Sequence, residues 1–188
     1  MHNNMTHFKN ITLLHLLMVT LWLPACTQKQ ENSAQAQAPA VDLQTAVVTG
    51  NLEVVQQHIA AGTNLNQKDP MTSSTPLITA MVFGHQAIAK ALIAAGADLS
   101  VQNNDGSTAL HTAAFFCRVE MVQMLLDAKA DKTIRNQYGA TPRETVLGDF
   151  AEVKPVYDMM LQQLAPMGLT LNYEEMQKAR PVIALMLQ

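Results

Sequence analysis

Two consecutive stretches decide the fold: STPLITAMVFGHQAIAKALIAAGADLSVQN (Ser74–Asn103) and GSTALHTAAFFCRVEMVQMLLDAKADKTIRN (Gly106–Asn136). The second stretch repeats the first with a period of 33 residues, since Thr75-Pro76-Leu77 corresponds to Thr108-Ala109-Leu110 and again to Thr141-Pro142-Arg143. Self-similarity at a fixed period of roughly 20–50 residues indicates stacked structural units. Further matches keep the same interval: Ala80 and Ala113, Leu92 and Leu125, and Ala97-Asp98 and Ala130-Asp131.

An earlier segment, Val41–Asn66, aligns with the first stretch at an offset of 34 residues. The additional residue falls in Gln67–Ser74, where a loop can absorb it. The matching positions are Ala46 and Ala80, Gly50 and Gly84, and Gly62 and Gly96.

With these residues the chain resembles the ankyrin repeat family, from Val41 to about Glu144. The resemblance implies an all-α fold, an ankyrin-repeat solenoid of about four stacked helix-turn-helix units. Paired antiparallel helices would be joined by long loops that end in β-turns. We expect the repeats over residues 41–148 and an atypical helical C-terminal cap over residues 149–188.

Local helix signals agree with this architecture. Threonines precede three apolar helical stretches, where a hydroxyl can accept a bond from a free helix N–H; they are Thr75, Thr108 and Thr141. Pro76 and Pro142 follow at the first helical position, which needs no N–H donor. Gly84 and Gly96 stand where helices must end, as expected of left-handed caps.

Beyond Gly148 the repeat pattern ends, and apolar residues recur at helical spacing instead. Asn172 and Glu175 form a capping-box pattern, Pro155 is best placed in a first turn, and Pro181 predicts a kink or a new short helix. Because a repeat stack must cover its last apolar face, this segment is expected to close the C-terminal end. Its methionines have the spacing of packed residues rather than of a cofactor site, and no cofactor is expected: Met159, Met160, Met167, Met176 and Met186.

The first 25 residues have the layout of an export signal. Lys9 is the only charge before a 13-residue apolar run, Ile11–Leu23, which is shorter than the roughly 20 residues of a spanning helix. The run ends in Leu23-Pro24-Ala25-Cys26, which resembles a bacterial lipobox except at Pro24. Lipidation of Cys26 would anchor the protein in the membrane, and the alternative is a plain secretory signal cut nearby.

Both alternatives place the protein outside the cytoplasm. The lipoprotein reading predicts a periplasmic protein, with the outer membrane favoured over the inner one because Thr27 follows the cysteine. If the lipobox is not processed, a secreted soluble form is expected. Residues 26–40 are polar and rich in Gln and Ala, which predicts a flexible linker.

Composition excludes several classes of function. The net charge is −3, aromatic residues are 5% of the chain, and Lys and Arg are scattered, so nucleic acid is not an expected partner. Metal-ligand spacing, phosphate loops and known nucleophile motifs do not occur in the sequence. No enzymatic activity is expected.

His111 and Cys117 cannot act together as base and nucleophile. Six helical residues separate them by about 9 Å along the axis and about 120° around it. The resemblance implies that His111 bonds to Thr108 and to the backbone. Cys117 stands at the place of Gly84 in a turn that favours positive φ, and it is either a small buried residue or a redox-sensitive thiol.

The resemblance assigns partner binding to the concave face of the stack. Residues at the end of each first helix and at the turn tips would line it. One or both of Phe115 and Phe116 could instead pack within the stack. The expected partner-binding residues are Met71, Thr72, Ser74, Val82, Phe83, Asn104, Asp105, Ser107, Phe115, Phe116 and Tyr138.

These observations predict a non-enzymatic, monomeric, periplasmic scaffold that binds another protein. A sharper version is that it inhibits, or protects against, a partner enzyme or toxin. The alternative is an envelope stress protein in which Cys117 responds to oxidants. Fold alone does not name the partner.

Overall fold

The computed structural model describes residues 38–188, and over this range the secondary structure is helical with no strand. The predicted signal peptide, Cys26 and nearly all of the predicted linker lie outside the described residues. Within residues 38–188 no helix combines the length and the apolar character that a membrane crossing requires.

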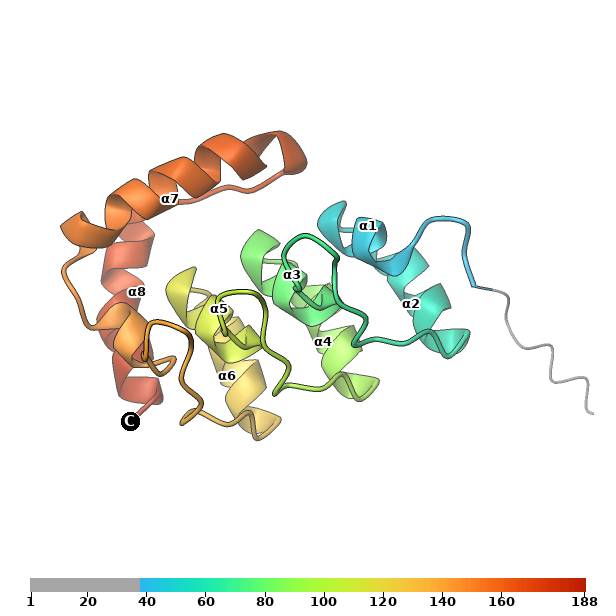
Figure 1. Ribbon diagram of the computed structural model, residues 1–188, viewed down its shortest axis with the longest axis horizontal. Helices are drawn as coiled ribbons and strands as arrows, with labels where there is room; N and C mark the ends of the chain where they lie inside the picture. Colours follow the sequence, from blue (N-terminus) through green and yellow to red (C-terminus); the bar gives the residue numbers. More distant parts are fainter. Residues whose placement is uncertain (1–37) are drawn as a thin grey trace, which may run out of the picture. The chain divides into compact units, whose positions relative to one another are not determined.

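Three helix pairs form the repeats (Figure 1). The first helices of successive pairs pack on one another, and so do the second helices, which makes a continuous stack. This confirms the predicted all-α solenoid of stacked helix pairs. The pairs are α1 (Leu43–Val48) and α2 (Leu52–Ala60), α3 (Pro76–Phe83) and α4 (Gln86–Ala94), and α5 (Ala109–Phe115) and α6 (Val119–Asp127).

The predicted caps set the helix boundaries. The Thr75 hydroxyl accepts from the Ile78 N–H at 3.3 Å, with Pro76 in the first helical turn. Gly84 ends α3 at a φ of 74°, in the left-handed region that glycine adopts without steric cost. Thr108 caps α5 in the same way, so the first helices of the second and third repeats begin at equivalent residues.

One apolar core runs through the stack. It contains Leu77, Leu92, Leu110 and Leu125, each almost completely removed from solvent. Because these residues recur at the repeat interval, each repeat contributes the same positions to the shared core.

The fourth unit departs from the pattern. Thr141 and Glu144 bond reciprocally, with the Thr141 N–H 2.7 Å from Glu144 Oε2 and the Glu144 N–H 3.4 Å from Thr141 Oγ1. The helix that follows is nevertheless a single 3-10 turn, η1 (Glu144–Val146). It is short because Gly148 and Asp149 follow within three residues, and the Asp149 carboxylate accepts from the Ala151 N–H to start α7 (Phe150–Leu164).

The place beside η1 is taken by the last helix of the chain, α8 (Tyr173–Met186), which packs against α6 and η1. The Arg143 Nε donates to the Ala184 carbonyl at 3.1 Å and joins the two elements. Consequently α7 and the 3-10 turn η2 (Ala165–Met167) are an insertion between the two elements that complete the fourth unit (Figure 1).

Both helices continue through a proline, so the expected first-turn position of Pro155 is wrong, and Pro181 does not start a new helix. Pro155 is the sixth residue of α7, and Pro181 lies in the second half of α8. Both prolines are exposed. Water can therefore bond the carbonyl that loses its helix partner, which lowers the cost of keeping the proline.

Candidate binding groove

A cavity of about 450 Å³ lies between the first helices of the second and third repeats, the tips of the repeat loops, and α7. Its walls are mainly apolar, and its rim is polar. The residues that line it are Ile78, Val82, Asn103, Asp105, Ser107, His111, Thr112, Phe115, Phe116, Asn136, Tyr138, Ala140, Thr145, Val156 and Met160. We call this cavity the groove.

Two phenylalanines at the end of α5 contribute to the floor of the groove. Phe116 is only 3% exposed, and Phe115 is half-buried. Tyr157 of α7 covers them, with its ring centroid 4.6 Å from that of Phe115 and 6.5 Å from that of Phe116. Of the two alternatives left open for the phenylalanines, packing within the fold therefore holds for Phe116, which the chain itself covers.

Tyr157 is the residue that attaches α7 to the stack. It is completely buried, and its hydroxyl donates to the Phe115 carbonyl at 2.6 Å. Phe150 and Tyr173 pack around its ring, at centroid distances of 5.7 Å and 6.4 Å. Burial is the main reason that the pKa of the Tyr157 hydroxyl is raised, so this donor keeps its proton.

The flank of α7 next to Tyr157 forms one wall of the groove. Val156 and Met160 line the cavity, and Val156 is 41% exposed. Met159 on the same helix is 52% exposed and does not line it. Methionine is a flexible side chain that adapts to different contact shapes.

Hydrogen bonds between neighbouring loops fix the rim. The Asn104 N–H donates to the Thr72 carbonyl at 3.0 Å, and the equivalent Gln137 N–H donates to the Asp105 carbonyl at 2.9 Å. Within the last loop, Asn136 Oδ1 accepts from the Tyr138 N–H at 3.0 Å. The rim residues Asp105 and Tyr138 thus lie on adjacent tips whose backbones are bonded together.

The structure brings together six of the eleven predicted partner-binding residues. Those that line the groove are Val82, Asp105, Ser107, Phe115, Phe116 and Tyr138. The other five do not line it: Met71, Thr72, Ser74, Phe83 and Asn104.

The five residues outside the groove have other positions. Ser74 is buried, because it leads into the Thr75 cap, which corrects its assignment to an accessible tip. Phe83 stacks on His85 at 6.0 Å, and the Asn104 side chain donates to the Met71 carbonyl at 2.7 Å. Met71 and Thr72 are exposed on the tip of the preceding loop.

Sequence reasoning missed the α7 wall. Val156 and Met160 belong to the helical pattern after Gly148, and that pattern predicts a helix without indicating which surface it covers.

His111 has a structural role beneath the groove. The Thr108 N–H donates to His111 Nδ1 at 3.2 Å, and Nε2 lies 3.0 Å from the Ala140 carbonyl that it donates to. These two bonds select the neutral tautomer with the proton on Nε2. Burial lowers the pKa of His111, so it remains neutral and joins the third and fourth units.

Cys117 has a positive φ of 56° in the turn between α5 and α6, like Gly84 at the equivalent position of the preceding repeat. Its thiol lies 3.7 Å from the Phe115 carbonyl and is partly buried. Burial raises the pKa of the thiol to about 11, and the nearby Arg180 and Arg118 lower it less. Because the thiolate is the reactive species, this environment favours the packing interpretation over the redox one.

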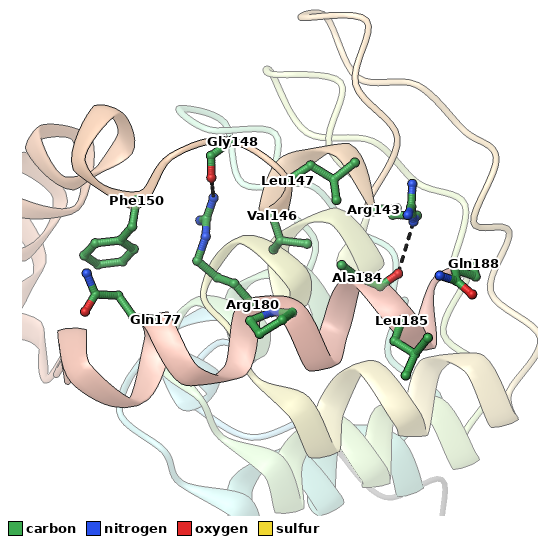
Figure 2. Close-up of a pocket in the computed structure, with 11 residues that line it drawn as sticks. Arg143, Val146, Leu147, Gly148, Phe150, Gln177, Arg180, Ala184, Leu185 and Gln188 are labelled. Atoms are coloured by element: carbon green, nitrogen blue, oxygen red, sulfur yellow. Dashed lines mark hydrogen bonds between the residues drawn. The ribbon is translucent and has the colours of Figure 1, made fainter.

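A larger cavity, of about 650 Å³, lies between η1 and α8 (Figure 2). Figure 2 shows its two arginines bonded to the backbone, Arg143 to Ala184 and Arg180 to Gly148 at 2.8 Å. None of the predicted partner-binding residues lines it.

Among residues 38–188, His, Cys, Asp and Glu form no cluster of three or more that could hold a metal ion.

The comparisons with known proteins agree with the repeat architecture. Protein phosphatase 1 regulatory subunit 27 from Mus musculus is 42% identical over 64 residues, and the Homo sapiens protein is 41% identical over the same length. The aligned region is 34% of this chain, which spans about two-fifths (41%) of the length of these curated relatives. The family model for ankyrin repeats, in three copies, matches residues 43–136, half of the chain. This chain therefore belongs to the ankyrin repeat family.

Proposed function

We propose that this protein is a non-enzymatic scaffold that binds one partner protein in the groove between α5, the loop tips and α7. The observation that carries the proposal is the groove itself, an apolar cavity with a polar rim on the loop-tip side of an ankyrin stack. A buried apolar centre with a polar edge is the usual anatomy of a protein interface.

The partner is an enzyme or a toxin that the bound scaffold inhibits or protects against. The two curated relatives support this reading, because their names describe regulatory subunits of a phosphatase. A regulatory role requires a binding surface and no catalytic group of its own.

The scaffold acts in the periplasm, where a lipid on Cys26 holds it at the outer membrane. The support is the sequence pattern that ends at Leu23-Pro24-Ala25-Cys26 and the polar linker that follows. The scaffold is secreted in soluble form if processing at Pro24 fails.

A matched pair of variants on α7 tests the groove. Val156→Arg places a long charged side chain in the cavity, whereas Met159→Arg adds the same side chain to the same helix outside it. Affinity capture from the native envelope, followed by quantitative mass spectrometry, compares each variant with the unmodified protein.

We expect Val156→Arg to reduce the captured partner at least tenfold and Met159→Arg to leave it unchanged. Both positions are exposed, so neither change should unfold the domain, and circular dichroism checks this. Equal capture by all three proteins would exclude the groove as the binding surface.

A further inference from the structure

The groove has one charged side chain, and it is acidic. Among the residues that line the groove, Asp105 carries the only formal charge, and neither Lys nor Arg is present. Burial keeps His111 neutral, and its Nδ1 accepts a hydrogen bond from the Thr108 N–H, which a protonated nitrogen cannot do. The local electrostatic preference is therefore for a positively charged group.

The Asp105 carboxylate also differs from the other loop aspartates. Asp69, Asp98 and Asp131 each accept hydrogen bonds from their own loops, for example from the Thr72, Ser100 and Thr133 N–H groups at 2.8 Å. For Asp105 the described residues supply no side-chain hydrogen bond, and the carboxylate stays open at the rim. Its loop is instead held by Asn103 Oδ1, which accepts from the Asp105 and Ser107 N–H groups.

An aromatic ring lies on the adjacent tip. Tyr138 is 79% exposed although it lines the groove, and its loop is bonded to that of Asp105 through the Gln137 N–H. A carboxylate and an aromatic ring that line the same groove on adjacent tips match a guanidinium group, which can pair with the carboxylate and stack on the ring. Lysine can pair with the carboxylate, but it lacks the planar group for stacking.

Beside this pair the groove accepts an apolar side chain. Val82 and Phe115 form its floor, and Val156 and Met160 form its α7 wall. A volume of about 450 Å³ holds a few side chains, whereas a helix is roughly 10–12 Å across. An extended segment, which rises about 3.3 Å per residue, can place one side chain in the cavity and a neighbouring one at the rim.

We propose that the groove binds an extended segment of the partner protein, with a large apolar side chain in the cavity and a neighbouring arginine between the Asp105 carboxylate and the Tyr138 ring. This inference rests on the proposed function and specifies the chemistry that the partner must present. Its support is the charge complementarity of the rim and the apolar character of the adjoining cavity.

A library of random heptapeptides displayed on phage, selected on the full chain, tests the assignment. We expect the selected peptides to carry arginine within about three residues of Leu, Met or Phe. For a selected peptide, Asp105→Asn and Tyr138→Ala should each weaken binding at least tenfold. Asp105→Lys should shift the selection toward acidic peptides. Glu152→Gln is the matched control, because Glu152 is an exposed acid on α7 that does not line the groove.

Three other results overturn the proposal. If the selected peptides show no arginine preference but bind Val156→Arg less tightly than the unmodified protein, the arginine assignment is overturned and the groove remains a binding site. Peptides that bind equally well to Val156→Arg would overturn this proposal and count against the proposed function too. A selection that enriches no peptide would overturn the extended-segment proposal, while partner capture with the α7 variants would still decide the proposed function.

Discussion

His111 shows how equivalent positions of successive repeats can hold different residues. Its ring completes the cap of α5 and reaches the Ala140 carbonyl, while the equivalent position in the preceding repeat is the buried Ile78. An apolar residue therefore fits this position in one repeat. In the next repeat a neutral imidazole adds a bond to the following unit.

The depressed pKa of His111 makes stability depend on pH. The unfolded chain takes up the His111 proton near the ordinary pKa of 6.5, while the folded protein does so only at lower pH. Stability should therefore be unaffected by this group above pH 6.5 and should fall as pH drops below it, by at most about 1.4 kcal/mol per pH unit. Urea unfolding at pH 7.5 and pH 5.5 measures the change.

His111→Ile is the control for this prediction, because it copies the preceding repeat. It should lower stability at both pH values, since the Ala140 carbonyl loses its donor, and it should reduce the difference between them. An unchanged difference would show that other groups cause the pH dependence.

The Cys117 thiol should react slowly in the folded protein. A rise in its pKa from 9.0 to about 11 lowers the thiolate fraction at pH 8 by about 100-fold, and the reaction rate should fall with it. Labelling with a disulfide reagent in Cys26→Ser, which leaves a single thiol, gives the rate with and without denaturant. Fast labelling of the folded protein would revive the redox interpretation.

At the scale of the elements, the parts that follow the repeat were predictable from sequence, and so was a helix after Gly148, but the surface that this helix covers was not. Thr75, Gly84 and Thr108 act on their own helices, so short-range patterns identify them. The position of α7 depends on the bond from Tyr157 to the Phe115 carbonyl, 42 residues away. No period or local pattern connects these two residues, and for this reason the contact of α7 with the phenylalanines and the α7 wall of the groove were missed.

The attachment of α7 predicts a local effect of Tyr157→Phe. The variant keeps the ring but removes the hydroxyl that bonds Phe115, which should cost about 1–2 kcal/mol. Because this bond holds α7 and not the repeats, hydrogen exchange should become faster in residues 150–171 and stay unchanged in α1–α6.

Tyr173→Phe is the matched control for this change. It also removes a tyrosine hydroxyl, but the lost bond is an exposed one to Asp158 at 2.7 Å. We expect little change in the hydrogen exchange of residues 150–171 in Tyr173→Phe. Equal exchange in both variants would show that the Phe115 bond does not hold α7.

At the scale of the whole molecule, the prediction concerns its anchor. If Cys26 is lipidated, a palmitate analogue should label the protein in a Gram-negative host, and the protein should sediment with membranes. Cys26→Ser should abolish both results. Cys117→Ser should preserve both, because that residue lies in the repeats. A protein that is released and unlabelled would indicate the plain secretory signal.

The bonds between neighbouring loop tips have a consequence for engineering. The same backbone hydrogen bond occurs twice, one repeat apart: from Asn104 to Thr72 and from Gln137 to Asp105. If residues 73–105 were duplicated in the chain, the inserted repeat could thus form this hydrogen bond with the loop before it and with the loop after it. The molecule could be lengthened by whole repeats, and each added repeat would extend the binding surface for a longer segment of the partner.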